Sequence, residues 1–179
     1  MARRHHLYER AFEAFCRDRG LPYLAIDESR RAILPEGQPV PDRLKAFDFL
    51  LYGEKSHLLC ELKGRKIAAR SKQDPAKPGR LDSWVTLDDV ASLETWQGLF
   101  GPGYEAAFVF LYWCEAPPPG SLFQETFQHE GRWYAVRLVR LADYTGAMKP
   151  RSVRWRTVHL SAAAFEQLSQ PLTRTVLAV

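Results

Sequence analysis

The chain has 179 residues, 46% of them hydrophobic, which suits one domain over residues 1–179 that is large enough to build a core. It has no apolar run of about eighteen residues, so we expect no membrane-spanning helix. The formal net charge of +4 is modest, and three dispersed cysteines give neither a disulfide framework nor a CxxC zinc signature, which favours the reducing cytoplasm.

The first predicted element is a helix over residues 3–19, with Gly20 as its stop signal. Apolar side chains recur at helical spacing and form one face, made by Tyr8, Ala11, Phe12 and Phe15. Glu9 lies at the edge of this face, and Glu13 lies closer to solvent. On the helix pattern alone, Glu9 is a solvated residue that pairs with a neighbour such as Arg10.

Residues 21–26 are predicted to form a first strand, with residues 31–34 as its continuation or as a short second piece. Residues 35–45 contain three prolines and are predicted to form a loop. Asp42 has no fixed direction in such a loop, so it is a weaker candidate for a metal ligand than an acid held on a strand.

A β-hairpin is predicted next, because apolar runs at residues 47–52 and 57–63 flank the turn-forming residues 53–56. If Tyr52 pairs with His57, Asp48 lies opposite Glu61, with their Cβ atoms roughly 4.5–5.5 Å apart. Strand periodicity places Lys63 on the same face as Glu61. The other face is predicted to be apolar throughout, with Phe47, Phe49, Leu51, Leu58, Cys60 and Leu62.

Two acids and a lysine on this hairpin need a physical reason, because buried charges are unfavourable unless they are paired or bind a metal. Two converging carboxylates suit a hard cation such as Mg²⁺. A lysine beside them can hold an attacking water and offset the charge that develops on a phosphate. The alternative is a structural ion pair between Lys63 and one of the acids.

A basic segment follows at residues 64–80, with Asp74 as its single acid. Its cations are Arg65, Lys66, Arg70, Lys72, Lys77 and Arg80. Because the segment leaves the proposed carboxylate site, it suits a phosphate backbone. We expect nucleic-acid contacts from Arg65, Lys66, Arg70 and Lys72. The alternative is a solvated surface loop.

A second helix is predicted from its N-cap Thr86 to Leu99, packed on the sheet. Gln97 on this helix is a weak candidate for contact with the site. Residues 105–113 are almost continuously apolar and are predicted to form a central strand that is buried on both faces.

The C-terminal residues are predicted to add strands at 122–127 and 133–139, a loop at 144–150, a strand at 151–160, and a helix from its cap Ser161 to Leu168. Alternation in the strand at 151–160 puts Arg154 and Arg156 on one face, where they form a second cluster for nucleic acid. Trp155 lies on the other face and is expected in the core, the alternative being a ring that stacks on a base.

The spacing of Asp48 and Glu61-Leu62-Lys63 resembles the active-site pattern of the PD-(D/E)XK nuclease superfamily. A helix with a Glu that is followed by Gly20 resembles the Holliday-junction-resolvase-like branch, over residues 7 to about 113. The resemblance implies an α/β fold with a restriction-endonuclease-like core, α-β-β-β-α-β, in which helices flank a mixed sheet. This core would span about residues 3–113, and residues 114–179 would form a C-terminal extension with extra strands and a short terminal helix.

The resemblance also implies an activity: a Mg²⁺- or Mn²⁺-dependent endonuclease that hydrolyses phosphodiester bonds in DNA. Asp48, Glu61 and the carbonyl of Leu62 would bind the metal, and Lys63 would orient the attacking water. The helix Glu of the family maps onto Glu9, with Glu13 as the fallback. Relatives of this branch are commonly dimers, so the resemblance implies a homodimer.

Two further readings stay open at the level of the sequence. One is a nucleic-acid-binding or assembly protein that keeps the nuclease fold without chemistry. The other is a structural or protein-interaction domain whose acids form salt bridges, which predicts no binding of divalent metal. Two acids face to face in an apolar hairpin repel each other, and this favours a protein that uses them for metal.

Overall fold

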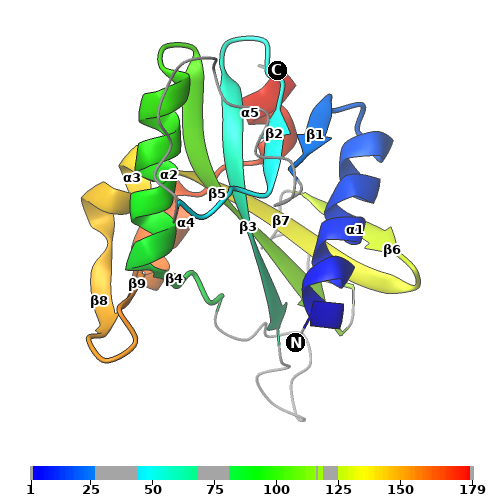
Figure 1. Cartoon of the computed structure of the whole chain (residues 1–179). Coiled ribbons are helices and arrows are strands. Elements are labelled where there is room, and N and C mark those ends of the chain that lie inside the picture. The colour runs from blue at the N-terminus through cyan, green and yellow to red at the C-terminus, as the bar shows by residue number, and fades with distance from the viewer. Residues whose placement is uncertain (1, 27–43, 68–80, 116, 119–124, 178–179) are drawn as a thin grey trace, which may run out of the picture.

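The computed structural model describes residues 2–26, 44–67, 81–115, 117–118 and 125–177 (Figure 1). In chain order the elements are α1 (Ala2–Asp18), β1 (Tyr23–Ala25), β2 (Phe49–Leu51), β3 (His57–Ile67), β4 (Val85–Thr86), α2 (Leu87–Phe100), β5 (Tyr104–Cys114), β6 (Thr126–His129), β7 (Arg132–Arg140), α3 (Leu141–Ala147), β8 (Lys149–Ser152), β9 (Thr157–His159), α4 (Ala162–Leu168) and α5 (Leu172–Leu177). The predicted order α-β-β-β-α-β is confirmed, with the short β4 added before α2.

A six-stranded mixed sheet forms the centre of the molecule, in the order β1-β2-β3-β5-β7-β6. Strands β3 and β5 run parallel, and the other described neighbours in this sheet run antiparallel. Strand β5 is buried over nearly its whole length, as its apolar sequence predicts. Its position between β3 and β7 makes it the central strand on which both layers of helices pack.

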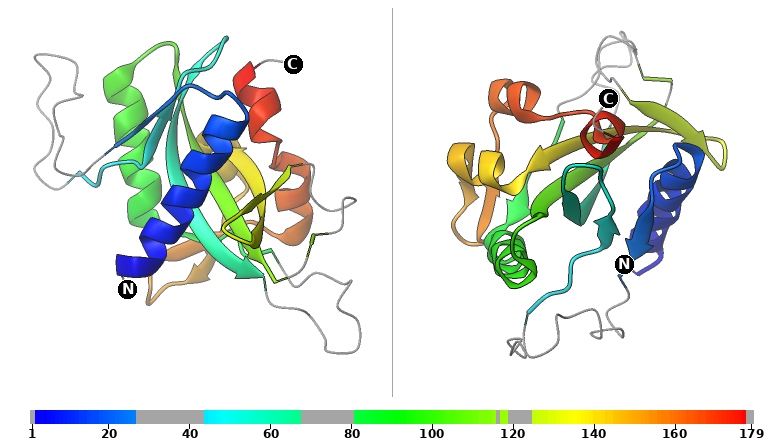
Figure 2. Two further views of the ribbon diagram at one scale, coloured as in Figure 1. Left: turned by 90° about the vertical axis from the view of Figure 1, so that its right-hand side faces the viewer. Right: turned by 90° about the horizontal axis from the view of Figure 1, so that it is seen from above.

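Helices cover both faces of the sheet (Figures 1 and 2). One core contains side chains of α1 and α5, with Phe12, Phe15 and Val176 against β3 and β5. The second core contains side chains of α2, α3 and α4, together with Val85 of β4 and Val158 of β9. Alternate residues of β5 therefore enter opposite cores, as the two-residue period of a strand requires.

The predicted hairpin register is confirmed for residues 49–51, where Phe49 pairs with Cys60 and Leu51 with Leu58. The regular pairing stops there. The backbone N–H of Asp48 donates over 2.9 Å to the carbonyl of Cys60, the residue that Phe49 already faces, so Asp48 and Glu61 are not a regular ladder pair. The prediction for Phe47 is wrong, because this side chain packs against Trp96 in the core beneath α2. Strand β2 begins at Phe49, so its alternation does not extend back to residue 47.

The C-terminal region differs most from the predicted elements. Residues 144–150, predicted as a loop, contribute to α3 and β8, and the predicted strand at 151–160 is a hairpin of β8 and β9. This hairpin joins β4 in a second sheet, with the order β4-β9-β8. The strand predicted at 122–127 is described only as β6, at Thr126–His129, and α5 was not predicted.

The turn of this hairpin explains the wrong prediction for Trp155. Arg156 adopts a left-handed backbone with φ of +48°, which reverses the chain where a continuous strand was expected. Trp155 is 70% exposed and Val153 is 88% exposed, so neither side chain belongs to the core. Apolar and basic residues alternate through this turn in the same pattern as through a strand, and the sequence pattern alone does not distinguish the two.

Among the described helices, none is long and apolar enough to span a membrane.

Helix α1 crosses β3 closely at Gly64. An ideal Cβ at this glycine would lie 2.3 Å from two atoms of the Tyr8 ring. The contact fixes the height at which the N-terminal half of α1 passes over β3, one residue beyond Lys63. A glycine here is therefore required by packing rather than by the backbone angle.

We predict that Gly64→Ala lowers the free energy of unfolding by roughly 1–3 kcal/mol, because the new methyl group overpacks the contact with Tyr8. Gly98→Ala is the matched control, since Gly98 lies in α2 with open space around its Cβ position. This control should raise stability by about 0.5–1 kcal/mol through helix propensity. Urea unfolding of both variants checks the prediction, and equal effects would show that Tyr8 does not pack on Gly64.

Candidate active site

Asp48 is held against the backbone of β3. Its Oδ2 accepts a hydrogen bond of 2.6 Å from the N–H of Leu62. In a strand the N–H and C=O of one residue point to the same side, so the Leu62 carbonyl also faces the side on which Asp48 lies. Since β2 begins at Phe49 and ends by Leu51, β3 continues past Asp48 without β2 beside it.

Glu61 and Lys63 point to the face of β3 that packs toward α2. Leu59, on the same side of the strand, belongs to the core beneath α2. Glu61 is only 4% exposed, and the side chain of Lys63 is 13% exposed. The Nζ of Lys63 donates to Oε1 of Glu61 over 2.8 Å. The acid and the lysine of the sequence pattern are therefore adjacent and largely buried.

Two further residues complete a closed ring of alternating charges, which we call the charge ring: Lys45, Glu61, Lys63 and Asp89. Lys45 contacts Glu61 and lies 2.6 Å from Oδ1 of Asp89. Lys63 lies 2.7 Å from Oδ2 of Asp89. Each cation thus bridges both acids, and each acid accepts from both cations. This arrangement lowers the free energy of holding four charges in a partly buried position.

Asp89 reaches the ring because it belongs to the first turn of α2. The Thr86 side chain accepts from the N–H of Asp89, and the Asp89 carboxylate accepts from the N–H of Thr86, each over 3.0 Å. This capping box fixes the carboxylate at the helix start. Burial alone would raise the pKa of Asp89, but Lys63 and Lys45 outweigh it and hold that pKa well below its usual range.

Lys45 responds to the same contacts in the opposite direction. Burial lowers the pKa of its ammonium group, but the nearby charge of Glu61 and its hydrogen bonds to Asp89 and Glu61 raise that pKa above its ordinary value. Lys45 therefore stays charged at every physiological pH.

Asp48 is the titratable acid of the site. Burial, followed by the charge of Glu61, raises its pKa to about 7, against the opposing effects of the Leu62 N–H, Lys63 and Lys45. The charge of Glu61 acts on Asp48 because the two carboxyl groups lie close enough to repel each other. A cation between them would favour the ionised form of both.

Sequence reasoning missed Lys45 and Asp89. Lys45 was assigned to the end of a loop, three residues before Asp48, and Asp89 was assigned only to the first turn of its helix. The sequence signal for Asp89 was its capping-box spacing from Thr86, which fixes a carboxylate at the helix start. The first turn of α2 lies over Lys63 because of how the helix packs on the sheet. No local sequence pattern predicts this packing.

The structure places Glu9 on α1, on the opposite face of β3 from the charge ring. The carboxylate Oε2 of Glu9 lies 3.1 Å from Nδ1 of the His6 ring, and the Glu9 side chain is 26% exposed. Its neighbour Tyr8 lies over Gly64, so α1 passes β3 at the level of the site. The fallback acid Glu13 contacts Arg17 and Tyr23. A catalytic part for Glu9 stays a prediction.

The predicted nucleic-acid residues are distributed over two regions. Arg65 donates to the carbonyl of Trp84 over 2.6 Å and lies over that ring, with 4.2 Å between its guanidinium and the ring centroid. Lys66 pairs with Glu115 over 2.6 Å. Arg154 and Arg156 lie at the turn between β8 and β9 rather than on a strand. Arg70, Lys72 and the weak candidate Asp42 lie outside the described residues.

Gln97 has a structural role. Its Oε1 accepts a 2.6 Å hydrogen bond from the N–H of Ala106, which ties the end of α2 to β5. The weak prediction that Gln97 contacts the site is wrong, because its side chain bonds to β5 near the end of α2 that lies opposite Asp89.

The donor set is compatible with a hard divalent cation. Asp48 and Glu61 supply carboxylate oxygens, and the Leu62 carbonyl faces the same side as Asp48; oxygen ligands of these kinds suit Mg²⁺ and Mn²⁺. Over the part of the chain that the structure describes, no three His, Cys, Asp or Glu side chains gather in a metal-binding cluster. A metal here would depend on water or substrate oxygen to complete its coordination.

Comparison with known proteins supports the nuclease-like fold. No family model and no curated protein matches the chain. Among solved structures, Hjc, a Holliday junction resolvase from the archaeal hyperthermophile Archaeoglobus fulgidus, matches with a TM-score of 0.54. The match covers 96% of this chain and 98% of that one, at 12% sequence identity. The predicted fold class is confirmed, and at this identity the likeness is one of fold.

We predict that Asp48→Asn stabilises the protein at pH 8 but not at pH 4, in the presence of a chelator. The native pKa of about 7 exceeds the ordinary value, so native Asp48 binds more protons than the unfolded chain between pH 4 and 7. Wild-type stability therefore falls across this window, relative to Asn, by roughly 2–4 kcal/mol. Asparagine still accepts the Leu62 hydrogen bond. Urea unfolding at several pH values checks this, and a difference independent of pH would contradict the raised pKa.

Proposed function

We propose that this chain is a metal-dependent endonuclease that hydrolyses phosphodiester bonds in DNA. The observation that carries the proposal is the meeting of Asp48, Glu61 and Lys63 at one point of a nuclease-like fold, where Glu61 helps to raise the pKa of Asp48. A purely structural cluster would have no need for Asp48, because the charge ring is already balanced without it.

The residues that would hold Mg²⁺ or Mn²⁺ are Asp48, Glu61 and the carbonyl of Leu62. When bound, such a metal supplies Lewis-acid stabilisation of charge on the phosphate and a water of lowered pKa. The Leu62 N–H holds Asp48 in place through Oδ2, which orients the carboxylate before any ligand arrives. This preorganisation is the contribution of the β3 backbone to the site.

Lys63 is proposed to orient the attacking water and to offset charge on the phosphate. In the structure its ammonium lies between Glu61 and Asp89, at 2.8 and 2.7 Å. Asp89 is a positioning residue in this proposal, because it holds Lys63 from the fixed first turn of α2. Lys45 balances the charge of both acids and stays protonated throughout.

We propose that the DNA lies along Arg65 and Lys66 and extends to Arg154 and Arg156, with Arg70 and Lys72 in the adjoining basic segment. The fold shared with a Holliday junction resolvase favours branched or recombination substrates over plain duplex. The same likeness supports a homodimer as the active form. Glu9 is retained as a further acid of the site, since α1 passes β3 at that level.

A second candidate function is nucleic-acid binding without cleavage. The observation that favours it is the completeness of the charge ring: two lysines already neutralise Glu61 and Asp89. A chain that had lost metal binding would keep such a ring for stability alone. The two functions differ in whether Asp48 and Glu61 bind a divalent ion.

We predict that wild type binds Mn²⁺ in calorimetry at moderate salt and that Glu61→Gln and Asp48→Asn both lose this binding. Each change removes a carboxylate charge from the two-acid site while keeping its shape. If Asp48→Asn leaves the affinity for Mn²⁺ untouched, the assignment of the site is wrong.

We predict that Lys63→Ala retains Mn²⁺ binding but slows cleavage of branched DNA by roughly 100-fold or more, because it removes a group that acts on the reacting water and phosphate. Lys55→Ala is the matched control, because Lys55 is exposed in the turn before β3, away from the charge ring. This variant should cleave branched DNA at the wild-type rate. Equal rates for the two lysine variants would favour binding without chemistry.

A further inference from the structure

The hairpin of β8 and β9 concentrates positive charge at an exposed tip. Residues 148–159 contain Lys149, Arg151, Arg154 and Arg156 and no acid, which equals the formal net charge of +4 for the whole chain. At the tip, Trp155 is 70% exposed and Val153 is 88% exposed. Two large apolar side chains in water at the end of a basic hairpin are a feature that folding alone does not explain.

Short-range contacts shape the tip. The N–H of Trp155 donates to Oγ of Ser152 over 3.2 Å, and the N–H of Arg156 donates to the carbonyl of Val153 over 3.2 Å. The guanidinium of Arg154 lies 5.3 Å from the centroid of the Trp155 ring. The indole therefore stands exposed at the turn, with a cation over its ring.

The same hairpin is joined directly to the candidate active site. Strand β9 pairs with β4, Thr157 with Thr86, and the carbonyl of Arg156 accepts from the N–H of Leu87 over 2.9 Å. Thr86 is the residue that caps α2 and fixes Asp89 in the charge ring. Figure 1 shows the hairpin projecting beside the first turn of α2. The hairpin therefore adjoins the helix start that carries Asp89 of the charge ring.

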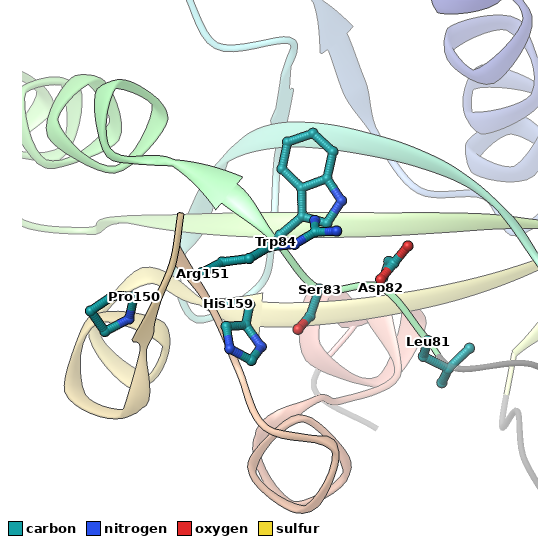
Figure 3. Close-up of a pocket in the computed structure, with 7 residues that line it drawn as sticks. All are labelled: Leu81, Asp82, Ser83, Trp84, Pro150, Arg151 and His159. Carbon is teal, nitrogen blue, oxygen red and sulfur yellow. The ribbon is translucent and has the colours of Figure 1, made fainter. Parts of the chain in front are cut away.

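Between the charge ring and the tip lies a second aromatic residue flanked by cations. Trp84 has the Arg65 guanidinium 4.2 Å from its ring centroid and the Arg151 guanidinium 5.0 Å from it. Figure 3 shows Arg151 reaching to Trp84 beside a cavity of about 240 Å³ that His159 also lines. Aromatic and basic groups thus alternate from β3 to the hairpin tip.

We propose that the hairpin of β8 and β9 is a contact for unpaired bases of DNA, in which Trp155 stacks on an exposed base and the surrounding cations contact phosphates. This proposal rests on the proposed function, since it places the hairpin beside the cleaved strand. An exposed indole with guanidinium groups suits bases and phosphates together, because every base offers a π-face and every linkage a negative charge. Asp88 of α2 lies 3.3 Å from Arg156, and the other cations of the hairpin outnumber this one exposed acid, which disfavours a basic protein partner.

The test uses two DNA duplexes, one fully paired and one with a single unpaired 2-aminopurine, and the full-length protein in a chelator so that no strand is cut. We expect wild type to quench the 2-aminopurine fluorescence and to prefer the duplex with the unpaired base. Trp155→Ala should lose the quenching and weaken binding to that duplex by about 5- to 150-fold, the range expected for one base–aromatic stack. Trp155→Phe should restore part of both signals.

Tyr52→Ala is the matched control, because Tyr52 is another exposed aromatic residue, 42% exposed, in the turn before β3. It should leave both signals unchanged. Arg154→Ala should reduce the salt dependence of binding on both duplexes by about one counterion, as a phosphate contact requires. Unfolding by urea should be the same for wild type and Trp155→Ala, since the side chain is exposed.

Three results would overturn the proposal: equal affinity of wild type and Trp155→Ala for the unpaired-base duplex, binding of phosphatidylserine vesicles in place of DNA, or a dimer that Trp155→Ala dissociates. The outcome is separable from the nuclease proposal. If the protein cleaves DNA with a metal but Trp155→Ala binds the unpaired-base duplex as wild type does, only the proposed hairpin contact is rejected. If quenching depends on Trp155 but the protein binds no Mn²⁺, the hairpin contact is supported and the proposed nuclease activity is rejected.

Discussion

Two lysines and two acids, from three separate parts of the chain, hold the candidate active site together. Lys45 precedes β2, Glu61 and Lys63 lie on β3, and Asp89 starts α2. Four charges can be this close and this buried only because each is paired twice. The ring consequently fixes the entry to β2, the start of α2 and the end of the β2–β3 hairpin relative to one another.

Asp48 is not one of the paired charges of the ring, so its position points to a role other than stability. Its carboxyl group is paired with a backbone N–H rather than with a lysine, and its charge is opposed by Glu61. The result is an acid poised near neutral pH beside a permanently charged cluster. Such a perturbed acid, in contact with a second acid and close to a lysine, is typical of sites that do chemistry.

The central part of the fold and site was predictable because short-range geometry determines it. A four-residue turn and a two-residue strand period are enough to place Phe49 opposite Cys60 and to bring Asp48, Glu61 and Lys63 to the same part of the hairpin. Lys45 and Asp89 were not predictable, since their contact depends on how a helix packs on a sheet forty residues away in sequence. Trp155 was assigned to the core because alternation continues through a turn that only the left-handed Arg156 reveals.

The C-terminal residues supply two strands, β7 and β6, of the central sheet. Strand β7 forms a ladder of eight residue pairs along β5, from Ala107–Arg140 to Cys114–Trp133. Without it, an eleven-residue strand with an almost wholly apolar sequence would become the open edge of the sheet. Open apolar edges recruit strands from other molecules. A chain trimmed after β5 would therefore leave this apolar edge open to strands of other molecules.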